Sequence, residues 1–344
     1  MKKVILSIVL VIVFIIGLSV LIVGVGTHEE SSNTTKNKKY VPKAESKIKS
    51  SYSKDELKMK VYITKKKTID SIDLEDYVKG VVSAEMPVEF PLEALKSQAV
   101  AARTYALAHK EAFGAGNAPR AHGGDVNDTT DFQVFMYKDE RLRLWPKSKR
   151  QEFWDKITQA VEKTEGEVLA YDGELVMSPY YFSTSGGKTE DAINVFNKEI
   201  PYLKSVDSPG EEKAHKYISS KTVTCDYAAD KLNSWNSNCN VKSKQLKKQI
   251  SILEKSKAGT VIKIKVGEKT ISGSKFRSIM GLNSSNFDIE FKNNNMIITC
   301  RGYGHGVGMS QWGSKAMANK GYDYKKILKH YYKGTDVIKL NVKR

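Results

Sequence analysis

Residues 4–25 form an apolar stretch without a charged side chain, interrupted only by serine and glycine. At about 1.5 Å per helical residue, this length suffices to cross a bilayer core of roughly 30 Å. Cleaved signal peptides usually have an apolar core of about 7–15 residues and a small-x-small cleavage site, and residues 24–27 (GVGT) match such a site poorly. We therefore predict that residues 1–27 are a cytoplasmic stub and a retained single-pass transmembrane anchor.

Charge predicts the orientation of this anchor. Lys2 and Lys3 precede the apolar stretch, which places the N-terminus in the cytoplasm and the remaining chain outside it, although further lysines in residues 36–39 weaken the asymmetry. The sequence holds 56 Lys and Arg against 39 Asp and Glu, a net charge of +17. Outside the membrane, a basic domain meets anionic lipids or cell-wall polymers before nucleic acid, and a simply solvated surface explains the excess equally well.

The rest of the chain divides by composition. Residues 28–56 contain few aliphatic residues, which is typical of a flexible linker. In residues 57–344 helical and strand patterns mix, which predicts an α+β domain of packed helices and antiparallel strands around a substrate groove. Residues 221–252 are polar and rich in lysine and asparagine, and we expect them to be a peripheral segment. Helices are expected over residues 74–86, 91–113, 154–164, 228–235, 310–319 and 324–332, and strands over 57–63, 166–171, 261–266, 287–291 and 296–300.

Glu85 is the first candidate for chemistry. Helical spacing aligns it with Val78, Val81 and Val82, so this carboxylate ends an otherwise apolar stripe. Burial and the negative end of the helix dipole both disfavour the ionised form, and they raise the pKa towards what a general acid needs. The alternative is a marginal carboxylate paired with a basic residue of the next helix, Lys96 or Arg103.

That next helix carries a polar row. Lys96 and Arg103 lie two turns apart on one face, with Gln98 and Tyr105 near its edges. A hairpin of the two helices would bring this row over Glu85. Polar rows opposite an alanine-rich face are, however, usually only solvated.

Two later segments offer binding groups. Residues 178–190 (SPYYFSTSGGKTE) combine aromatic rings that can stack on sugars with hydroxyls and glycines, but they lack the Gly-x-Ser-x-Gly pattern of a hydrolase nucleophile. In residues 301–313 (RGYGHGVGMSQWG), glycines alternate around a histidine and lead into a helix N-terminus, which favours negative charge. The candidate binding residues of these segments are Tyr180, Ser183, Ser185, Gly186, Thr189, Arg301, Tyr303, His305, Ser310 and Gln311.

Signals for metals and disulfides are weak. His122 precedes several acidic residues, but no Cys or His follows at a zinc spacing, so we predict neither a metal site nor a cofactor. Cys225 and Cys239 are close enough in the sequence to pair outside the cytoplasm, and the sequence leaves open whether they do.

Three segments together carry a family resemblance. Residues 80–107 (GVVSAEMPVEFPLEALKSQAVAARTYAL), followed in order by residues 183–190 and 302–313, resemble the three motifs of the stage II sporulation protein D family of endospore-forming bacteria. The resemblance spans about residues 57–332. It implies a lytic transglycosylase that cleaves the MurNAc–GlcNAc bond of peptidoglycan, leaving a 1,6-anhydro end, from the mother-cell membrane at the engulfing septum. Glu85 then corresponds to the catalytic acid.

The resemblance also implies partners and a substrate form. The expected substrate is glycan already stripped of stem peptides by an amidase, stage II sporulation protein P, and stage II sporulation protein M is the expected partner in a complex. A glycoside hydrolase needs two carboxylates and a lytic transglycosylase can work with one, which agrees with a single strong candidate. Lys96, Tyr180, Ser185, His305 and Gln311 would orient the sugars and steady developing charge.

One segment departs from the family. Some members hold zinc through His and Cys residues in the loop after the second helix. Here His122 aligns with the first ligand, whereas Asn127, Asp131 and Phe132 stand at the other positions. We therefore predict no structural zinc and a loop held by hydrogen bonds.

Three other functions remain open. The chain can be a non-catalytic, peptidoglycan-binding activator of a cell-wall amidase. It can be a hydrolase with a second carboxylate, such as Glu190 or Asp191. An amidase or peptidase is disfavoured because the sequence shows neither a metal triad nor an activated nucleophile.

Overall fold

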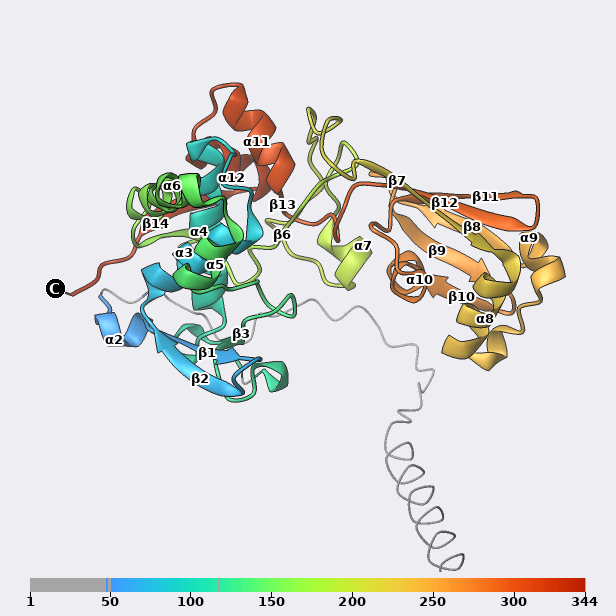
Figure 1. The fold of residues 1–344 in the computed structure, drawn as a ribbon, viewed down its shortest axis with the longest axis horizontal. Coiled ribbons are helices and arrows are strands. Elements are labelled where there is room, and N and C mark those ends of the chain that lie inside the picture. Colours follow the sequence, from blue (N-terminus) through green and yellow to red (C-terminus); the bar gives the residue numbers. More distant parts are fainter. Residues whose placement is uncertain (1–47, 49–50, 117, 344) are drawn as a thin grey trace, which may run out of the picture. The chain divides into compact units, whose positions relative to one another are not determined.

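The computed structural model describes residue 48 and residues 51–116 and 118–343 of the chain, and Figure 1 traces their course. The predicted anchor lies outside these residues, as does most of the predicted linker. None of the helices in the described ranges is long and apolar enough to cross a bilayer.

Helices α3 (Leu74–Glu85) and α4 (Leu92–Ala108) form the centre of the first core. The apolar stripe of α3 is buried as predicted, and the helix ends at Met86, whose extended backbone precedes a proline. Almost every residue of α4 is buried. It packs against α3, α6 (Arg150–Glu162), α11 (Gln311–Asn319), α12 (Tyr324–Tyr331) and β4 (Glu167–Tyr171). The expected solvent-facing side of α4 is therefore absent.

Small sheets surround this helix pair. One has the order β2 (Thr68–Ile72), β1 (Met59–Ile63), β3 (Val126–Asn127), and another the order β14 (Thr335–Lys339), β4, β5 (Glu174–Leu175). A tight turn at Asp172 and Gly173, both with positive φ, joins β4 to β5. The remaining elements here are α2 (Lys54–Leu57), η1 (Glu111–Phe113), η2 (Pro119–Ala121), α5 (Lys138–Leu144), η3 (Lys147–Lys149) and α7 (Ala192–Phe196).

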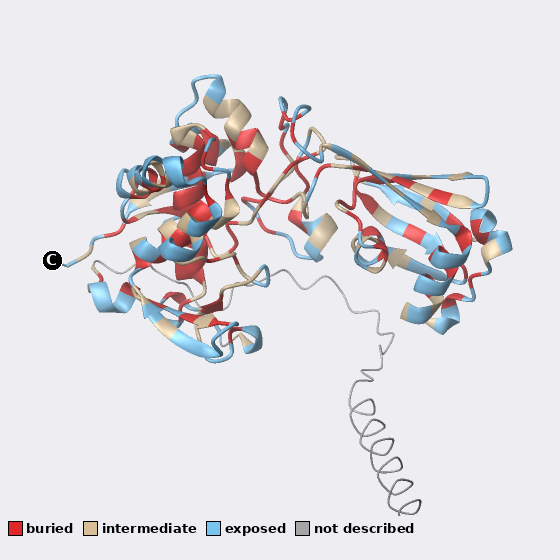
Figure 2. Cartoon of the chain, in the orientation of Figure 1, coloured by how far each residue is buried: buried red, intermediate tan, exposed pale blue. Residues whose placement is uncertain are grey.

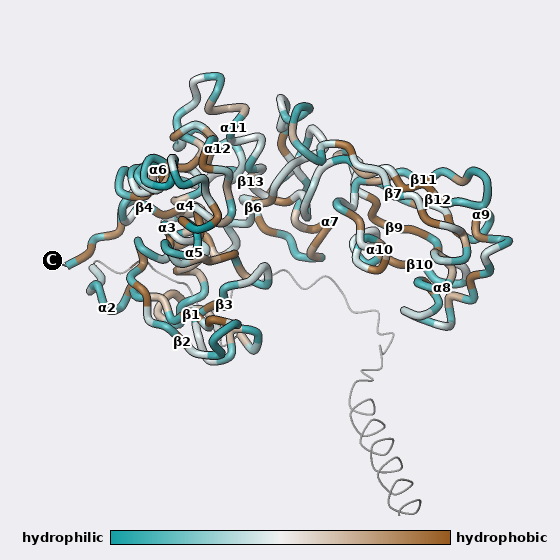
Figure 3. The backbone as a smooth tube through the Cα atoms, in the orientation of Figure 1, coloured by the Kyte–Doolittle hydropathy of each residue, from teal (hydrophilic) through white to brown (hydrophobic). Residues whose placement is uncertain are grey.

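Residues 218–301 build a second core. It contains the sheet β10 (Lys269–Ser272), β9 (Val261–Val266), β8 (Ile250–Lys255) and the sheet β11 (Phe287–Lys292), β12 (Asn295–Arg301), β7 (Ile218–Thr224). The helices α8 (Cys225–Trp235), α9 (Leu246–Gln249) and α10 (Gly273–Met280) and the turns η4 (Ser237–Cys239) and η5 (Ser243–Gln245) complete it. Figure 2 shows its buried positions, and in Figure 3 hydrophobic residues run along β9.

Two predictions from the sequence concern residues of this second core. The supposedly peripheral residues 221–252 supply several of its buried side chains, Leu232 and Leu246 among them, so they lie outside the first core but inside another. Cys225, Cys239 and Cys300 are buried and free, so the disulfide that the sequence left open does not form. The expected mixture of helices and antiparallel strands is confirmed.

Candidate functional site

Glu85 ends α3 and lies half-buried between distant segments. Its Oε1 accepts a hydrogen bond of 2.7 Å from the backbone N–H of Val134, and the side chain of Gln311 also hydrogen-bonds it. Burial raises the pKa of Glu85 above its usual value, and the two hydrogen bonds oppose that rise. The predicted direction of the shift is confirmed, with burial as its main cause.

Tyrosines enclose this carboxyl. The negative charge of Glu85 contributes to the raised pKa values of Tyr77, Tyr105 and Tyr181, so all three lie near it. Gln133 holds two of them, because its Nε2 donates to the Tyr77 hydroxyl over 3.1 Å and its Oε1 accepts from Tyr181 over 2.8 Å. No second carboxylate is among the groups that shift the pKa of Glu85.

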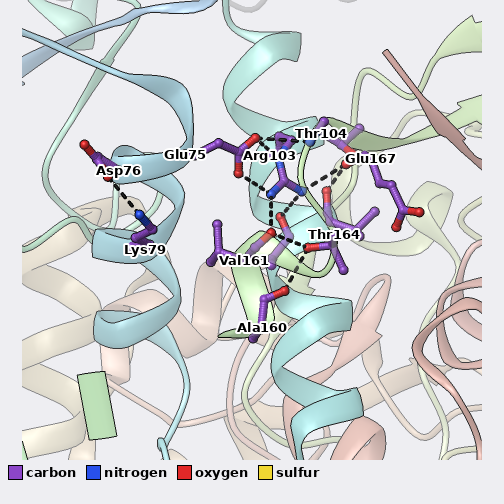
Figure 4. Close-up of polar contacts among 12 residues, drawn as sticks. Glu75, Asp76, Lys79, Arg103, Thr104, Ala160, Val161, Thr164 and Glu167 are labelled. Atoms are coloured by element: carbon purple, nitrogen blue, oxygen red, sulfur yellow. Dashed lines mark hydrogen bonds and ion pairs between the residues drawn. The ribbon is translucent and has the colours of Figure 1, made fainter. Parts of the chain in front are cut away.

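Arg103 does not join this site. Its side chain is completely buried and forms a bidentate ion pair with Glu75. It also donates to the carbonyl oxygens of Glu167 and Val161, so it ties α3, α4, α6 and β4 together (Figure 4). The predicted role of Arg103 in substrate binding is therefore wrong, because α4 is covered on the side that the sequence left open.

The other α4 candidates divide between two faces. Lys96 pairs with Glu93 over 2.9 Å and lies 4.2 Å from the ring centroid of Tyr324, so neither Lys96 nor Arg103 is the ion-pair partner of Glu85. Gln98 lies beside the site, where its Oε1 accepts from Gln311 over 3.4 Å. Its Nε2 is buried without a hydrogen-bond partner. Tyr105, stacked on His109, is also near Glu85.

The two later motifs meet through short strand pairs. β6 (Tyr181–Phe182) runs parallel to β13 (Met309–Ser310), and Thr184 exchanges two backbone hydrogen bonds with Tyr303. The carbonyl of Ser183 accepts the N–H of Trp312. This pairing sets the start of α11, and with it Gln311, against Glu85.

The buried carboxylate of Glu211, which the sequence did not indicate, hydrogen-bonds residues of both motifs. Glu211 accepts from the N–H and hydroxyl of Ser185 and from the hydroxyls of Ser208 and Ser310. Burial raises its pKa, against the effect of these hydrogen bonds. The hydroxyls of Ser185 and Ser310, predicted to bind substrate, thus donate to Glu211 instead.

His305 also has an internal role. Its Nδ1 accepts the N–H of Val307, so Nε2 carries the proton and donates to the carbonyl of Tyr181 over 3.1 Å. Enclosure beside the rings of Tyr180 and Phe182 lowers its pKa to about 4. A neutral ring with both nitrogens in use has none left for a sugar, so the predicted sugar contact is replaced by positioning of Tyr181.

The remaining candidates, Tyr180 excepted, contact residues outside the surroundings of Glu85. Arg301 pairs with Asp288, and Tyr303 is exposed with Lys216 over its ring. Thr189 hydrogen-bonds the backbone of Val206.

Gly186 permits a close approach of two loops, because a Cβ at this position would lie 2.8 Å from Asn286. Tyr180 packs on His305 and lies near Tyr105.

Neither proposed second carboxylate approaches Glu85. Glu190 is buried and accepts hydrogen bonds from Ser256, Asn194 and its own neighbour in the chain. Asp191 accepts the N–H of Ser205. Both carboxylates thus hold local structure.

The loop after α4 is held by hydrogen bonds. Asn127 donates to the carbonyl of Arg120 and accepts from Thr129, and Arg120 pairs with Asp131. His122 lies against Tyr62. Within the described ranges no three His, Cys, Asp or Glu side chains gather in a way that could hold a metal ion.

Gln133, Val134 and Glu211 are the site residues that sequence reasoning missed. Each acts through a contact distant in sequence, and Val134 acts only through its backbone. No motif or periodicity marks such residues.

Comparisons with known proteins agree on one family. Residues 62–171 match the SpoIID family model, described as a stage II sporulation protein. The chain is 37% identical over 312 residues to stage II sporulation protein D of Bacillus subtilis (strain 168), covering 91% of this chain and 87% of that protein. It is 38% identical over 280 residues to the protein of the same name from Bacillus amyloliquefaciens, covering 80% and 77%. An amidase enhancer of Bacillus subtilis is 31% identical over 309 residues, covering 75% of this chain and 40% of that protein.

Proposed function

Because the chain belongs to the stage II sporulation protein D family, we propose that it is a lytic transglycosylase that cleaves the MurNAc–GlcNAc bond of peptidoglycan during forespore engulfment. Glu85 is the proposed catalytic residue. One observation carries the proposal: a half-buried carboxyl with a raised pKa, held by Val134 and Gln311, lies among tyrosines with no second acid acting on it.

The proposed chemistry needs this one carboxyl twice. The protonated Glu85 donates its proton to the leaving glycosidic oxygen as the bond from that oxygen to C1 breaks. The resulting carboxylate then takes the proton of the C6 hydroxyl while O6 attacks C1, so a 1,6-anhydro ring forms and no water is consumed. The N–H of Val134 donates to Oε1, and we propose Oε2 as the oxygen that carries the proton.

Neighbouring polar groups fit a sugar ligand. Gln98 retains a free amide N–H beside Gln311, and the hydroxyl of Tyr105 lies near Glu85. A buried donor without a partner costs about 1–3 kcal/mol, which a substrate hydroxyl or acetamido oxygen would offset. We propose these two side chains, with Gln311 and Tyr180, as the sugar contacts.

The cellular setting is proposed from the family. The chain would be anchored by residues 4–25 with the described domain outside the cytoplasm, in the mother-cell membrane at the septum. Its substrate would be glycan stripped of stem peptides by stage II sporulation protein P, and stage II sporulation protein M would join the complex.

Product analysis tests the chemistry. Full-length wild type, Glu85→Gln and Glu89→Gln are incubated with peptide-free glycan strands, and soluble products are identified by mass spectrometry. Anhydro ends from wild type and from the exposed control Glu89→Gln, but not from Glu85→Gln, are the expected result. Reducing ends would contradict the transglycosylase and indicate hydrolysis.

The amidase-enhancer relative favours one alternative, a non-catalytic activator. Such a protein would bind glycan without cleaving it and would raise the rate of an added cell-wall amidase. Glu85→Gln would leave that stimulation intact, whereas it abolishes the anhydro products of a transglycosylase.

A further inference from the structure

Among the described residues, the two sheets of the second core have four edge strands, β7, β8, β10 and β11, and two of them border one hollow. β8 and β11 each lie at the edge of a three-stranded sheet. Together they line a hollow of about 610 Å³, which residues 250–252 and 288–291 border with Lys247. No backbone hydrogen bond joins β8 to β11 in the part of the chain that the structure describes.

The ladder pattern shows which backbone groups are free at β11. The N–H of Arg301 donates to the carbonyl of Asn286, so these residues form a hydrogen-bonded pair. Because such pairs alternate along an antiparallel ladder, Ile289 and Phe291 direct their N–H and C=O groups away from β12. Both residues border the hollow.

β8 has the same pattern over a shorter length. The N–H of Gly267 donates to the carbonyl of Gln249, which leaves the backbone groups of Ile250 and Ile252 free of β9. The β8 register then shifts after Ile252, whereas β11 pairs without a shift along its whole length. β11 is therefore the more regular template for an added strand.

The charges around the hollow indicate which kind of peptide could add to β11 as a further strand. A second hollow of about 230 Å³ shares Lys247 and Phe291 with the first and adds Lys244 and Lys292. Residues 218–300 contain fourteen Lys and Arg against six Asp and Glu. Two acidic side chains of β11 also border the first hollow: Asp288, which is paired with Lys255 and Arg301, and Glu290, which is exposed. One end of the groove is thus basic.

We propose that the groove between β8 and β11 binds an extended acidic peptide segment of a partner protein by strand addition to β11. Free backbone groups of an edge strand give such a segment its hydrogen bonds, and the lysines bind its carboxylates. This inference is independent of the proposed glycan chemistry.

A peptide-binding measurement tests the backbone part. The probe is a fluorescein-labelled nonapeptide alternating valine and glutamate, and polarisation is followed with the full chain in detergent. Phe291→Pro removes a free N–H without breaking a ladder bond. Thr222→Pro is the matched control, because Cys225 pairs with Asn294 and leaves Thr222 facing outward on the opposite edge. Affinity is expected to fall at least tenfold for Phe291→Pro and to stay unchanged for Thr222→Pro.

Charge variants keep the test decisive if Phe291→Pro does not fold. Lys247→Glu is expected to weaken binding at least fivefold, and Lys265→Glu, an exposed lysine outside the groove, is expected to have no effect. The same peptide N-methylated at alternate residues should not bind. Absent saturable binding, equal binding by the N-methylated peptide, or displacement by peptide-free glycan strands would each overturn the proposal.

Discussion

At Glu85, two hydrogen bonds oppose the effect of burial on one carboxyl. The N–H of Val134 and the side chain of Gln311 favour the charged form, while burial favours the neutral form and prevails. A general acid must be protonated, so its activity falls as the pH rises through its pKa. The balance of these contacts therefore sets the upper pH limit of the proposed reaction.

Gln311→Leu tests this balance. Removal of a hydrogen bond that stabilises the carboxylate is expected to raise the pKa of Glu85 and to move the high-pH limb of kcat/KM upward by about one pH unit. The measurement is the pH profile of anhydro-product release. Lys315→Leu, one helical turn further along α11, should leave the limb unchanged. An unmoved limb in Gln311→Leu would contradict the assigned contact.

The stability that His305 contributes falls as the pH falls, whereas the activity that depends on Glu85 falls as the pH rises. Its pKa is lowered to about 4 from the ordinary 6.5, so the unfolded chain binds the proton first as the pH falls. The contribution of the neutral ring is complete above pH 6.5 and is lost between pH 6.5 and 4.

Denaturant unfolding of wild type and His305→Gln at pH 7 and pH 5 measures this loss. The free-energy difference between the two proteins is expected to shrink by about 2 kcal/mol at pH 5. Comparison with the variant removes the contribution of the other titrating groups. A difference that is the same at both pH values would mean that His305 is not held neutral.

At the scale of elements, α4 explains the main error of the sequence reading. The side opposite its alanine-rich face was expected to be solvated, but it is buried too, against α6 and β4. Arg103 tolerates this burial because Glu75 and three backbone carbonyls satisfy its guanidinium.

Arg103→Ala is therefore expected to destabilise the fold by about 3–5 kcal/mol, since Glu75 would lose its charge partner. Lys79→Ala removes an ion pair within α3, the helix of Glu75, whose acidic partner Asp76 is exposed, and it should cost less than about 1 kcal/mol. Denaturant unfolding measures both. At temperatures where Arg103→Ala is folded, its KM should equal that of wild type, and a raised KM would restore the substrate-binding role.

For the whole described chain, the separate hydrophobic cores are the main feature. Phe276 is fully buried in the second core and Leu95 in the first. Cores without shared buried residues can open as separate cooperative units.

Phe276→Ala is expected to cost about 3–5 kcal/mol and to lower native-state hydrogen-exchange protection chiefly in residues 218–301. Leu95→Ala should instead lower protection in α3 and α4. Uniform loss of protection in both variants would show that the two cores unfold together.

The sequence by itself determined the helix that ends at Glu85, the mixed fold class and the family, because these depend on local periodicity and contiguous motifs. Tertiary structure alone decided which polar residues meet. Val134, Gln133 and Glu211 reach their partners across 49, 56 and 99 positions of the chain. A one-dimensional pattern records which side chains share a helix face but not what packs against it, and so Arg103 and His305 turned inward while Gln311 reached the carboxyl of Glu85.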